Sequence, residues 1–282
     1  MLTGPEKEEF PVIPPGRGDD LHNLEIADEA DLVLFMAGNQ FMVMDELIGA
    51  FQERYPEVKK IFYETLPPGL ELRQIIAGGA LFRDRVITGK PDVYTSVTAD
   101  AMEELLERGY IDEFHTYLHN RIVLMVPEGN PASIKGVEDL ARDEVRISQP
   151  GAMEDITKYI MSMYEAAGGE ALVNRIMEEK RAEGTTILTI VHHRETPLRL
   201  QKGTVDVGPV WATEFVHAKR EGLSVEKIEV GENLDQRSNV KYHVALLKDA
   251  PNRDNGRKFL SFLLSREAQS IYEKYGFVPA IK

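Results

Sequence analysis

The sequence contains no cysteine, which excludes disulfide bonds, thiolate metal ligands and a cysteine nucleophile. It also lacks any run of about 18 apolar residues, the length that a membrane-spanning helix requires. Its first residues show no basic flank followed by an apolar stretch, so an exported form would have lost its signal peptide. Neither GxGxxG nor GxxxxGK[ST] occurs, and we expect no nucleotide cofactor.

Basic residues are scarce relative to acidic ones: 33 Lys and Arg stand against 47 Asp and Glu, a formal net charge of -14 at pH 7. Such a chain repels nucleic acids and anionic membrane surfaces at long range, so neither is an expected partner. Hydrophobic residues make up 43% of the 282 positions, which is enough for two packed cores. We therefore expect two domains that do not act on polyanions.

Residues 1–30 combine prolines, glycines and acidic residues with little apolar periodicity, and we expect them to form an extended leader. After Asp31, apolar runs alternate with segments of helical period. The expected strands are 32–36, 58–64 and 91–95, and the expected helices are 41–55, 70–77 and 98–109. Strands that alternate with helices favour right-handed crossovers and a mostly parallel sheet, which we assign to a first lobe.

A second series follows the apolar strand 120–126 and the "PEGNP" break after it. Its expected strands are 145–148, 187–191 and 206–210, and its expected helices are 153–166, 169–180 and one starting at Thr213. The remaining elements must pack against a hydrophobic core, and the simplest arrangement places them in the first lobe. They are the last expected strand, 240–247, and the expected helices 252–264 and 266–275. We thus expect lobe one at 31–122 and 241–282 and lobe two at 123–240, with two crossing strands as a hinge.

This order of elements resembles the type II periplasmic solute-binding proteins, most closely their molybdate, tungstate and sulfate branch. The segments that carry the resemblance are "LVLFMAGNQFMVMDELIGAFQERYP", "GKPDVYTSVTADAMEELLERGYID", "VLMVPEGNPASIKGVEDL", "KGTVDVGPVWATE" and "FLSFLLSREAQSIYEKYGFVPA". They extend over residues 31–282. The resemblance implies an α/β fold of two lobes, each with a mostly parallel sheet flanked by helices, joined by a two-strand hinge.

The resemblance also implies a function. A small oxyanion such as molybdate or tungstate would bind in the cleft between the lobes, which close on it, and an ABC transporter permease would read the closed shape. The implied protein is a periplasmic or extracellular monomer without enzymatic activity, cofactor or bound metal. Its partners are the small anionic solute and the permease.

Ligands of such folds lie where loops leave the C-terminal ends of strands and face helix N-termini, whose free N–H groups favour anions. In lobe one, the small residues of the first loop let the backbone approach a ligand, and its amides offer donors and acceptors. The oxyanion branch commonly has a serine in each of the first two loops, whereas this chain has Asn39 and Pro67-Pro68-Gly69. The candidate residues of lobe one are Gly38, Asn39, Gln40, Thr65, Gly69 and Ser96.

In lobe two, the loop after strand 145–148 could present backbone N–H groups to an anion. Arg194 is the expected anion anchor, since a guanidinium can fork onto a carboxylate or oxyanion with two hydrogen bonds. Trp211, at a strand end, could either close over the ligand or pack in the core. The candidate residues of lobe two are Gln149, Gly151, Ala152, His193, Arg194, Glu195, Trp211 and Thr213.

Other interpretations stay open. Arg194 and the altered loops suit a small organic carboxylate as well as an oxyanion. His192, His193 and Glu195 could ligate a metal, although neighbouring side chains point to opposite sides and no further ligand follows at suitable spacing. The same loop, His192 to Glu195, could act as acid and base in an enzyme, and the chain could be a ligand-sensing module.

Overall fold

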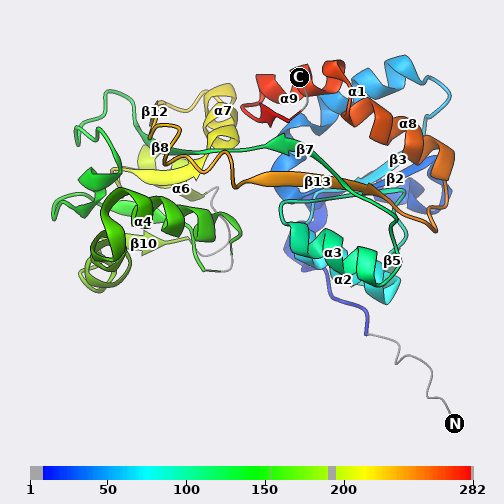
Figure 1. Ribbon diagram of the computed structural model, residues 1–282, viewed down its shortest axis with the longest axis horizontal. Helices are drawn as coiled ribbons and strands as arrows, with labels where there is room; N and C mark the ends of the chain where they lie inside the picture. Colours follow the sequence, from blue (N-terminus) through cyan, green and yellow to red (C-terminus); the bar gives the residue numbers. More distant parts are fainter. Residues whose placement is uncertain (1–8, 153, 190–194, 281–282) are drawn as a thin grey trace, which may run out of the picture. The chain divides into compact units, whose positions relative to one another are not determined.

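The computed structural model describes residues 9–152, 154–189 and 195–280 (Figure 1). The chain divides into two compact units. The first unit comprises Met1–Leu118, Lys241–Tyr272 and Pro279–Lys282, and the second comprises His119–Val240 and Glu273–Val278. Each unit combines strands with flanking helices, as the alternating sequence pattern predicted.

A seven-stranded sheet, in the order β1-β3-β2-β6-β13-β7-β14, supports the first unit. Its strands are β1 (Leu21–His22), β2 (Leu32–Phe35), β3 (Ile61–Glu64), β6 (Val93–Ser96), β7 (His115–His119), β13 (Lys241–Leu246) and β14 (Val278–Pro279). Strand β2 pairs in parallel with β3 and β6, whereas β1 and β13 run antiparallel to their neighbours β3 and β6. The sheet is therefore mixed rather than mostly parallel. The chain reaches β13 directly from the second unit, without the helical crossover that makes consecutive strands parallel. Strand β13 can therefore run antiparallel to β6.

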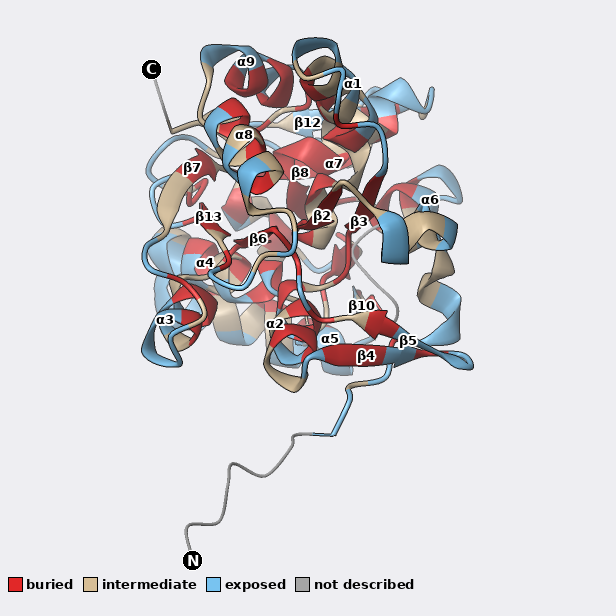
Figure 2. Cartoon of the chain, turned by 90° about the vertical axis from the view of Figure 1, so that its right-hand side faces the viewer, coloured by how far each residue is buried: buried red, intermediate tan, exposed pale blue. Residues whose placement is uncertain are grey.

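Helices cover both faces of this sheet. Figure 1 shows α1, α8 and α9 on one side and α2 and α3 on the other. Their bounds are α1 (Met44–Arg54), α2 (Pro68–Ala77), α3 (Ala99–Glu107), α8 (Arg253–Leu263) and α9 (Arg266–Lys274). Strands β2, β3 and β6 are buried at every position, as the red colour along them in Figure 2 shows. Burial on two faces explains why β2 is a continuous apolar run.

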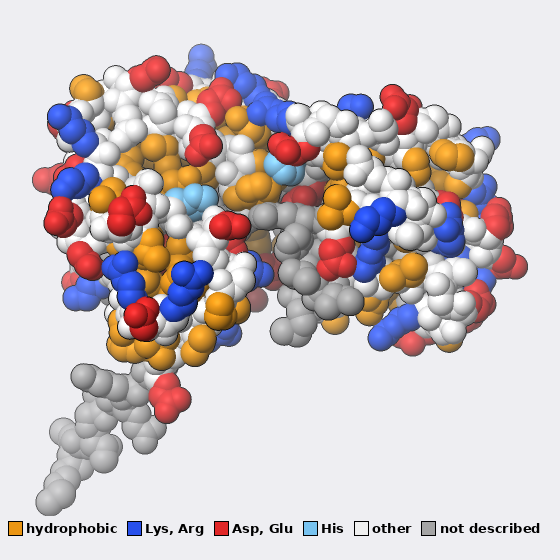
Figure 3. All heavy atoms as spheres, turned by 180° about the vertical axis from the view of Figure 1, so that it is seen from behind, with side chains coloured by type: hydrophobic (Ala, Val, Ile, Leu, Met, Phe, Trp, Pro, Cys, Tyr) orange, Lys and Arg blue, Asp and Glu red, His pale blue; other side chains and the backbone are white. Residues whose placement is uncertain are grey.

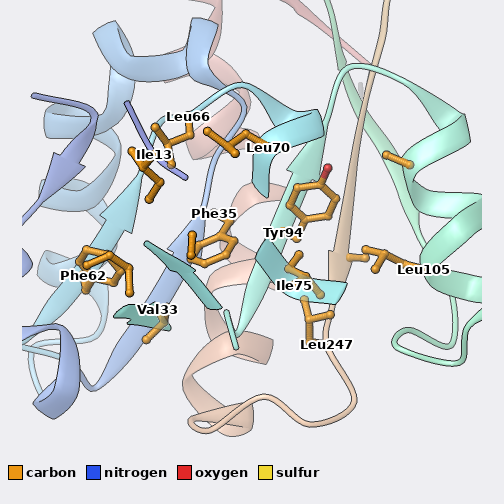
Figure 4. Packing of buried hydrophobic residues seen from close by; sticks show 14 of the residues in the cluster. Ile13, Val33, Phe35, Phe62, Leu66, Leu70, Ile75, Tyr94, Leu105 and Leu247 are labelled. Carbon is orange, nitrogen blue, oxygen red and sulfur yellow. The ribbon is translucent and has the colours of Figure 1, made fainter. Parts of the chain in front are cut away.

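Residues 9–30 are folded against the first unit, so the prediction of an extended leader is wrong for them. They contain β1 and two 3-10 helices, η1 (Pro15–Asp20) and η2 (Leu24–Glu29). The backbone N–H of Ile13 donates to the carbonyl oxygen of Leu81 at 2.8 Å, in a hairpin of β4 (Gly79–Phe82) and β5 (Arg85–Thr88) that the sequence analysis did not predict. Ile13 is fully buried in the same cluster as Leu66 (Figure 4).

Replacing Ile13 with alanine is therefore expected to lower the free energy of unfolding by about 3 kcal/mol, since it removes a buried side chain and leaves a cavity. Val12 is the matched control because its side chain is 62% exposed. Val12→Ala should change the urea midpoint little. Equal midpoints for the two variants would show that residues 9–30 contribute nothing to the folded core.

The second unit contains a three-stranded sheet, in the order β11-β8-β12, and a parallel pair, β10-β9. Strand β8 runs antiparallel to both of its neighbours. The strands are β8 (Ile122–Pro127), β9 (Ile147–Gln149), β10 (Thr186–Leu188), β11 (Gly208–Trp211) and β12 (Val225–Ile228). The helices are η4 (Val137–Ala141), α4 (Ile156–Asn174), the π-helical turn η5 (Arg175–Glu179), α5 (Lys180–Ala182), α6 (Glu195–Gln201) and α7 (Ala212–Arg220).

Residues Glu273–Val278 group with the second unit, whereas the sequence analysis placed them in lobe one. The guanidinium of Arg220 lies 3.6 Å from the centre of the Tyr275 ring, and it donates to the carbonyl oxygen of Lys274 at 3.2 Å. Gly276 has a φ of +90° and lies so close to α7 that a Cβ there would stand 3.0 Å from Val216. These contacts attach the segment to α7.

The surface carries both signs of charge. Figure 3 shows acidic and basic side chains interspersed over the viewed face, so the acidic excess is not gathered into one patch there. Among the described residues, we find no helix with both the length and the apolar character that crossing a membrane requires.

Candidate functional site

The first predicted loop follows β2 and forms the 3-10 helix η3 (Gly38–Val43). It lies directly against the second predicted loop, after β3. A Cβ at Gly38 would stand 2.8 Å from the carbonyl oxygen of Thr65 and 3.1 Å from that of Leu66. Because real Cβ atoms do not approach backbone oxygens so closely, only glycine fits here. The structure thus brings Gly38 and Thr65 together.

Gln40 is fully buried, and its amide links three side chains of the first unit. Its Nε2 donates to Thr95 Oγ1 at 3.0 Å, and its Oε1 accepts from the hydroxyls of Tyr117 at 2.7 Å and Tyr272 at 2.8 Å. Burial raises the pKa of Tyr117 and of Tyr272, so both phenols remain neutral donors. The side chain of Gln40 is engaged in the core, and it does not offer the free amide that the sequence analysis expected.

Asn39 is only half-buried. Its Nδ2 donates to the Tyr242 hydroxyl, while its Oδ1 has no hydrogen-bond partner among the described residues. The two ends of an amide can exchange places, and a hydroxyl can donate as well as accept. With the amide reversed, the buried end of the Asn39 side chain would be an N–H group without a partner among the described residues.

The remaining candidates of lobe one differ in exposure. Thr65 is 1% exposed, and its Oγ1 lies 3.3 Å from His22 Nε2. Ser96 is fully buried, and its Oγ accepts from the backbone N–H of Thr98 at 3.1 Å. Gly69 lies in the first turn of α2, is exposed and has no atom near its missing Cβ. The hydroxyls of Thr65 and Ser96 therefore stabilise loop conformation, and Gly69 leaves room for another group.

In the second unit, the backbone N–H of Gly151 already has two acceptors. These are Thr189 Oγ1 at 3.1 Å and Glu154 Oε1 at 3.2 Å. Gln149 is fully buried, and its Oε1 accepts from the Tyr164 hydroxyl at 2.7 Å. Ala152 is exposed. The donors expected from this loop are thus partly used inside the second unit.

Trp211 and Thr213 are buried where β11 leads into α7. The Trp211 side chain is 2% exposed, and its ring centre lies 5.8 Å from that of Tyr159. Thr213 Oγ1 accepts from Asn120 Nδ2 at 3.2 Å. These positions favour packing in the core, one of the two roles that the sequence left open for Trp211.

The loop proposed to hold the anion anchor is described only at its end, because His192, His193 and Arg194 lie outside the described residues. Glu195 begins α6, and its carboxylate pairs with Arg199 at 2.7 Å. Arg199 also donates to the carbonyl oxygens of Ile187 and Leu188 at 2.9 Å each. Arg199 therefore attaches α6 to the end of β10, and Glu195 orients its guanidinium. Elsewhere in the described chain, no three His, Asp or Glu side chains group to hold a metal ion.

Residues 32–278 match the family of bacterial extracellular solute-binding proteins. The chain belongs to this family. Among curated relatives, it is 24% identical to a Bacillus subtilis protein named as a candidate ABC transporter substrate-binding lipoprotein, over 71% of this chain and 72% of the relative. It is 22% identical to the molybdate/tungstate-binding protein WtpA of Thermococcus kodakarensis, over 86% of this chain and 80% of the relative.

Among solved structures, the fold is similar to that of the periplasmic molybdate-binding protein of Azotobacter vinelandii, with a TM-score of 0.68 and 16% identity, over 88% of this chain and 98% of the other. This similarity confirms the type II periplasmic binding protein fold. The resemblance to the molybdate, tungstate and sulfate branch is confirmed at the level of family and fold. The family is one of solute-binding proteins, and the Bacillus subtilis relative is named as a component of an ABC transporter.

A cavity of about 600 Å³ opens in the first unit of this solute-binding protein, and none of the predicted site residues that the structure describes lines it. Asp19 and Asp45 are in its wall, and the His22 and Tyr63 rings stack at 4.1 Å between centroids. Burial and the neighbouring Asp45 raise the pKa of Tyr63 to about 12, while burial lowers that of His22. Both rings are therefore neutral at pH 7. The two carboxylates would repel an anion.

Further polar groups hold the predicted loops in place, and of these only Thr95 belongs to a hydroxyl cluster that the sequence indicates. Thr95 Oγ1 accepts from the backbone N–H of Ala37 at 2.8 Å, and Thr189 and Glu154 hold Gly151. Thr95 could be recognised in the sequence because it is a hydroxyl residue near the end of a buried strand. Glu154 carries no such signal because a glutamate near a helix start is usually exposed.

Proposed function

We propose that this solute-binding component of an ABC transporter captures a small tetrahedral oxyanion of the molybdate or tungstate class. The family match over residues 32–278 is the observation that supports a role in transport, and it implies a periplasmic or extracellular location. The oxyanion is supported by the WtpA and Azotobacter relatives, whose names state these ligands. The partners are then the anion and the permease, and the protein acts as a monomer.

The chemistry of the first unit supports an anion. Asn39 with its amide reversed supplies one N–H donor, and the close contact at Gly38 sets the loop backbone beside that of Thr65. Gly69 adds an exposed backbone position at the start of α2, where the helix dipole favours negative charge. In the second unit, Arg194 provides the positive charge. Binding draws the two units together because the ligand has a higher affinity for the closed form.

A thermal-shift screen tests this function, because a ligand that binds only the folded state raises the unfolding midpoint. Molybdate or tungstate at about 100 times its dissociation constant should stabilise the protein by about 2.7 kcal/mol, a shift of several degrees for a chain of this size. Sodium chloride at equal ionic strength is the control. Small organic carboxylates are screened in parallel, because Arg194 and the loops at Asn39 and Gly69 could bind a carboxylate as well as an oxyanion.

A shift with a carboxylate alone would replace the oxyanion by an organic acid and leave the transport role intact. A shift with zinc or nickel alone would contradict anion binding and support His192 and His193 as metal ligands.

A further inference from the structure

Two carboxyl groups are fully buried beneath the second predicted loop of the first unit. Glu64 is the last residue of β3, and Glu71 lies in the first turn of α2. Both side chains are 0% exposed. The segment between them contains Thr65 and Leu66, whose carbonyl oxygens lie against Gly38. The pair thus flanks the loop to which we assign a role in anion binding.

Hydrogen bonds connect this pair to the loop. Glu71 Oε1 accepts from the backbone N–H of Leu66 at 3.2 Å. Gln74 Nε2 donates to Glu64 Oε1 at 3.0 Å and to the carbonyl oxygen of Thr88 at 2.8 Å. Glu71 therefore fixes the position of Leu66, and Gln74 fixes that of Glu64.

Donors are missing from the cluster. Glu64 Oε2, Glu71 Oε2 and Gln74 Oε1 are buried without a hydrogen-bond partner among the described residues. Ionised carboxylates only accept hydrogen bonds, so an ionised pair would leave these three oxygens unsatisfied. A proton on a carboxyl group supplies an O–H donor. Two buried ionised carboxylates without donors for these oxygens are costly, so burial favours the protonated form of the pair.

The described part of the chain offers this pair no compensating cation. In the described ranges, neither Glu64 nor Glu71 forms an ion pair with lysine or arginine. Burial raises the pKa of Glu64 to about 8, and burial with the nearby Glu64 raises that of Glu71 well above its usual value. The other titratable groups of the neighbouring elements are Asp20 and its partner Arg17 in η1, His22 in β1, Tyr94 in β6 and Tyr117 in β7.

We propose that Glu64 and Glu71 form a buried proton-binding site that positions the Thr65–Pro67 loop, so that anion binding is linked to proton uptake. The linkage rests on the proposed function, whereas the proton site does not. Loss of the protons places two negative charges beneath the loop. They repel one another across the β3–α2 connection, and they oppose an anion held by the loop.

The ligand-free protein tests the proton site. A carboxyl whose pKa is raised in the folded state stabilises that state most at low pH. The contribution of Glu64 to the free energy of unfolding falls as the pH rises from the pKa of the unfolded state, near 4.5, to the pKa of the folded state, about 8. The urea midpoint should therefore decrease from pH 5 to pH 8. Glu64→Gln and Glu71→Gln should each flatten this decrease, because glutamine imitates the protonated acid.

The amide resonance of Leu66 provides a local readout, because its N–H donates to Glu71. Its nitrogen shift should titrate at a pH well above the usual range of a glutamate in the unsubstituted protein, and this titration should be lost in Glu71→Gln. Glu53→Gln, on the exposed side of α1, controls for the removal of one charge and should leave both measurements unchanged. A flat Leu66 shift from pH 6 to pH 9, with an unaltered stability profile in both variants, would overturn the proton site.

Calorimetry with molybdate tests the linkage. The dissociation constant should rise above pH 8 by up to about tenfold per pH unit for one linked proton. In the double variant Glu64→Gln/Glu71→Gln, it should be the same at pH 7 and pH 9. An unchanged dissociation constant in the unsubstituted protein would overturn the linkage. If neither molybdate nor tungstate binds at any pH, the proposed function fails, and the linkage fails with it, while the ligand-free titration still decides the proton site.

Discussion

Gly38→Ala is expected to weaken molybdate binding about tenfold and to lower the free energy of unfolding by about 1–3 kcal/mol. The new Cβ would stand 2.8 Å from the carbonyl oxygen of Thr65 and 3.1 Å from that of Leu66. Both obstacles are backbone atoms, so no side-chain rotation relieves the contact. The first two loops must separate, and any ligand that contacts both loses part of its contacts. Calorimetry and urea unfolding measure the two effects.

Gly49→Ala is the matched control. Gly49 lies inside α1 with no atom within 4 Å of the added Cβ. Alanine is favoured over glycine in a helix by about 0.5–1 kcal/mol, so this variant should bind normally and be slightly more stable. If Gly38→Ala binds molybdate as well as Gly49→Ala does, the contact between the two loops has no role in binding.

Much of the fold could be predicted from apolar periodicity. The run at Leu32–Phe35 forms the buried interior strand β2, and the amphipathic segment after it contains α1. The N-terminal segment could not be predicted in this way, because Ile13 and Leu21 are separate apolar residues in an irregular segment. Neighbours distant in sequence bury them, and periodicity carries no information about such neighbours.

The loops of the candidate site were predicted from their place after strands, but the roles of their side chains were not. Gln40 follows Asn39 in a loop that contains two amide side chains. Its amide is nevertheless fully buried, because it accepts hydrogen bonds from Tyr117 and Tyr272, which are distant in the sequence. Glu64 ends a strand in which every position is buried, although strict alternation would expose one face. The sequence shows which residue types are present, whereas tertiary contacts decide which polar groups remain free for a ligand.

Gln40→Leu is expected to lower the free energy of unfolding by about 3 kcal/mol, because it removes the buried oxygen that accepts from the hydroxyls of both Tyr117 and Tyr272. Gln52→Leu is the matched control. Gln52 is partly exposed and donates to the carbonyl oxygens of Val58 and Lys59, so its loss should cost less than about 1 kcal/mol. Urea unfolding gives both values.

The Gln40 substitution also distinguishes a core role from a ligand role. In a double-mutant cycle with Tyr272→Phe, Gln40→Leu should cost less than it does alone, because one hydroxyl no longer needs an acceptor. A ligand role predicts the opposite pattern, in which molybdate affinity falls while the urea midpoint and the coupling with Tyr272 stay unchanged. The fully buried amide and its three side-chain partners favour the first result, since a donor held inside the core cannot reach a solute without breaking the bonds that hold η3 in place.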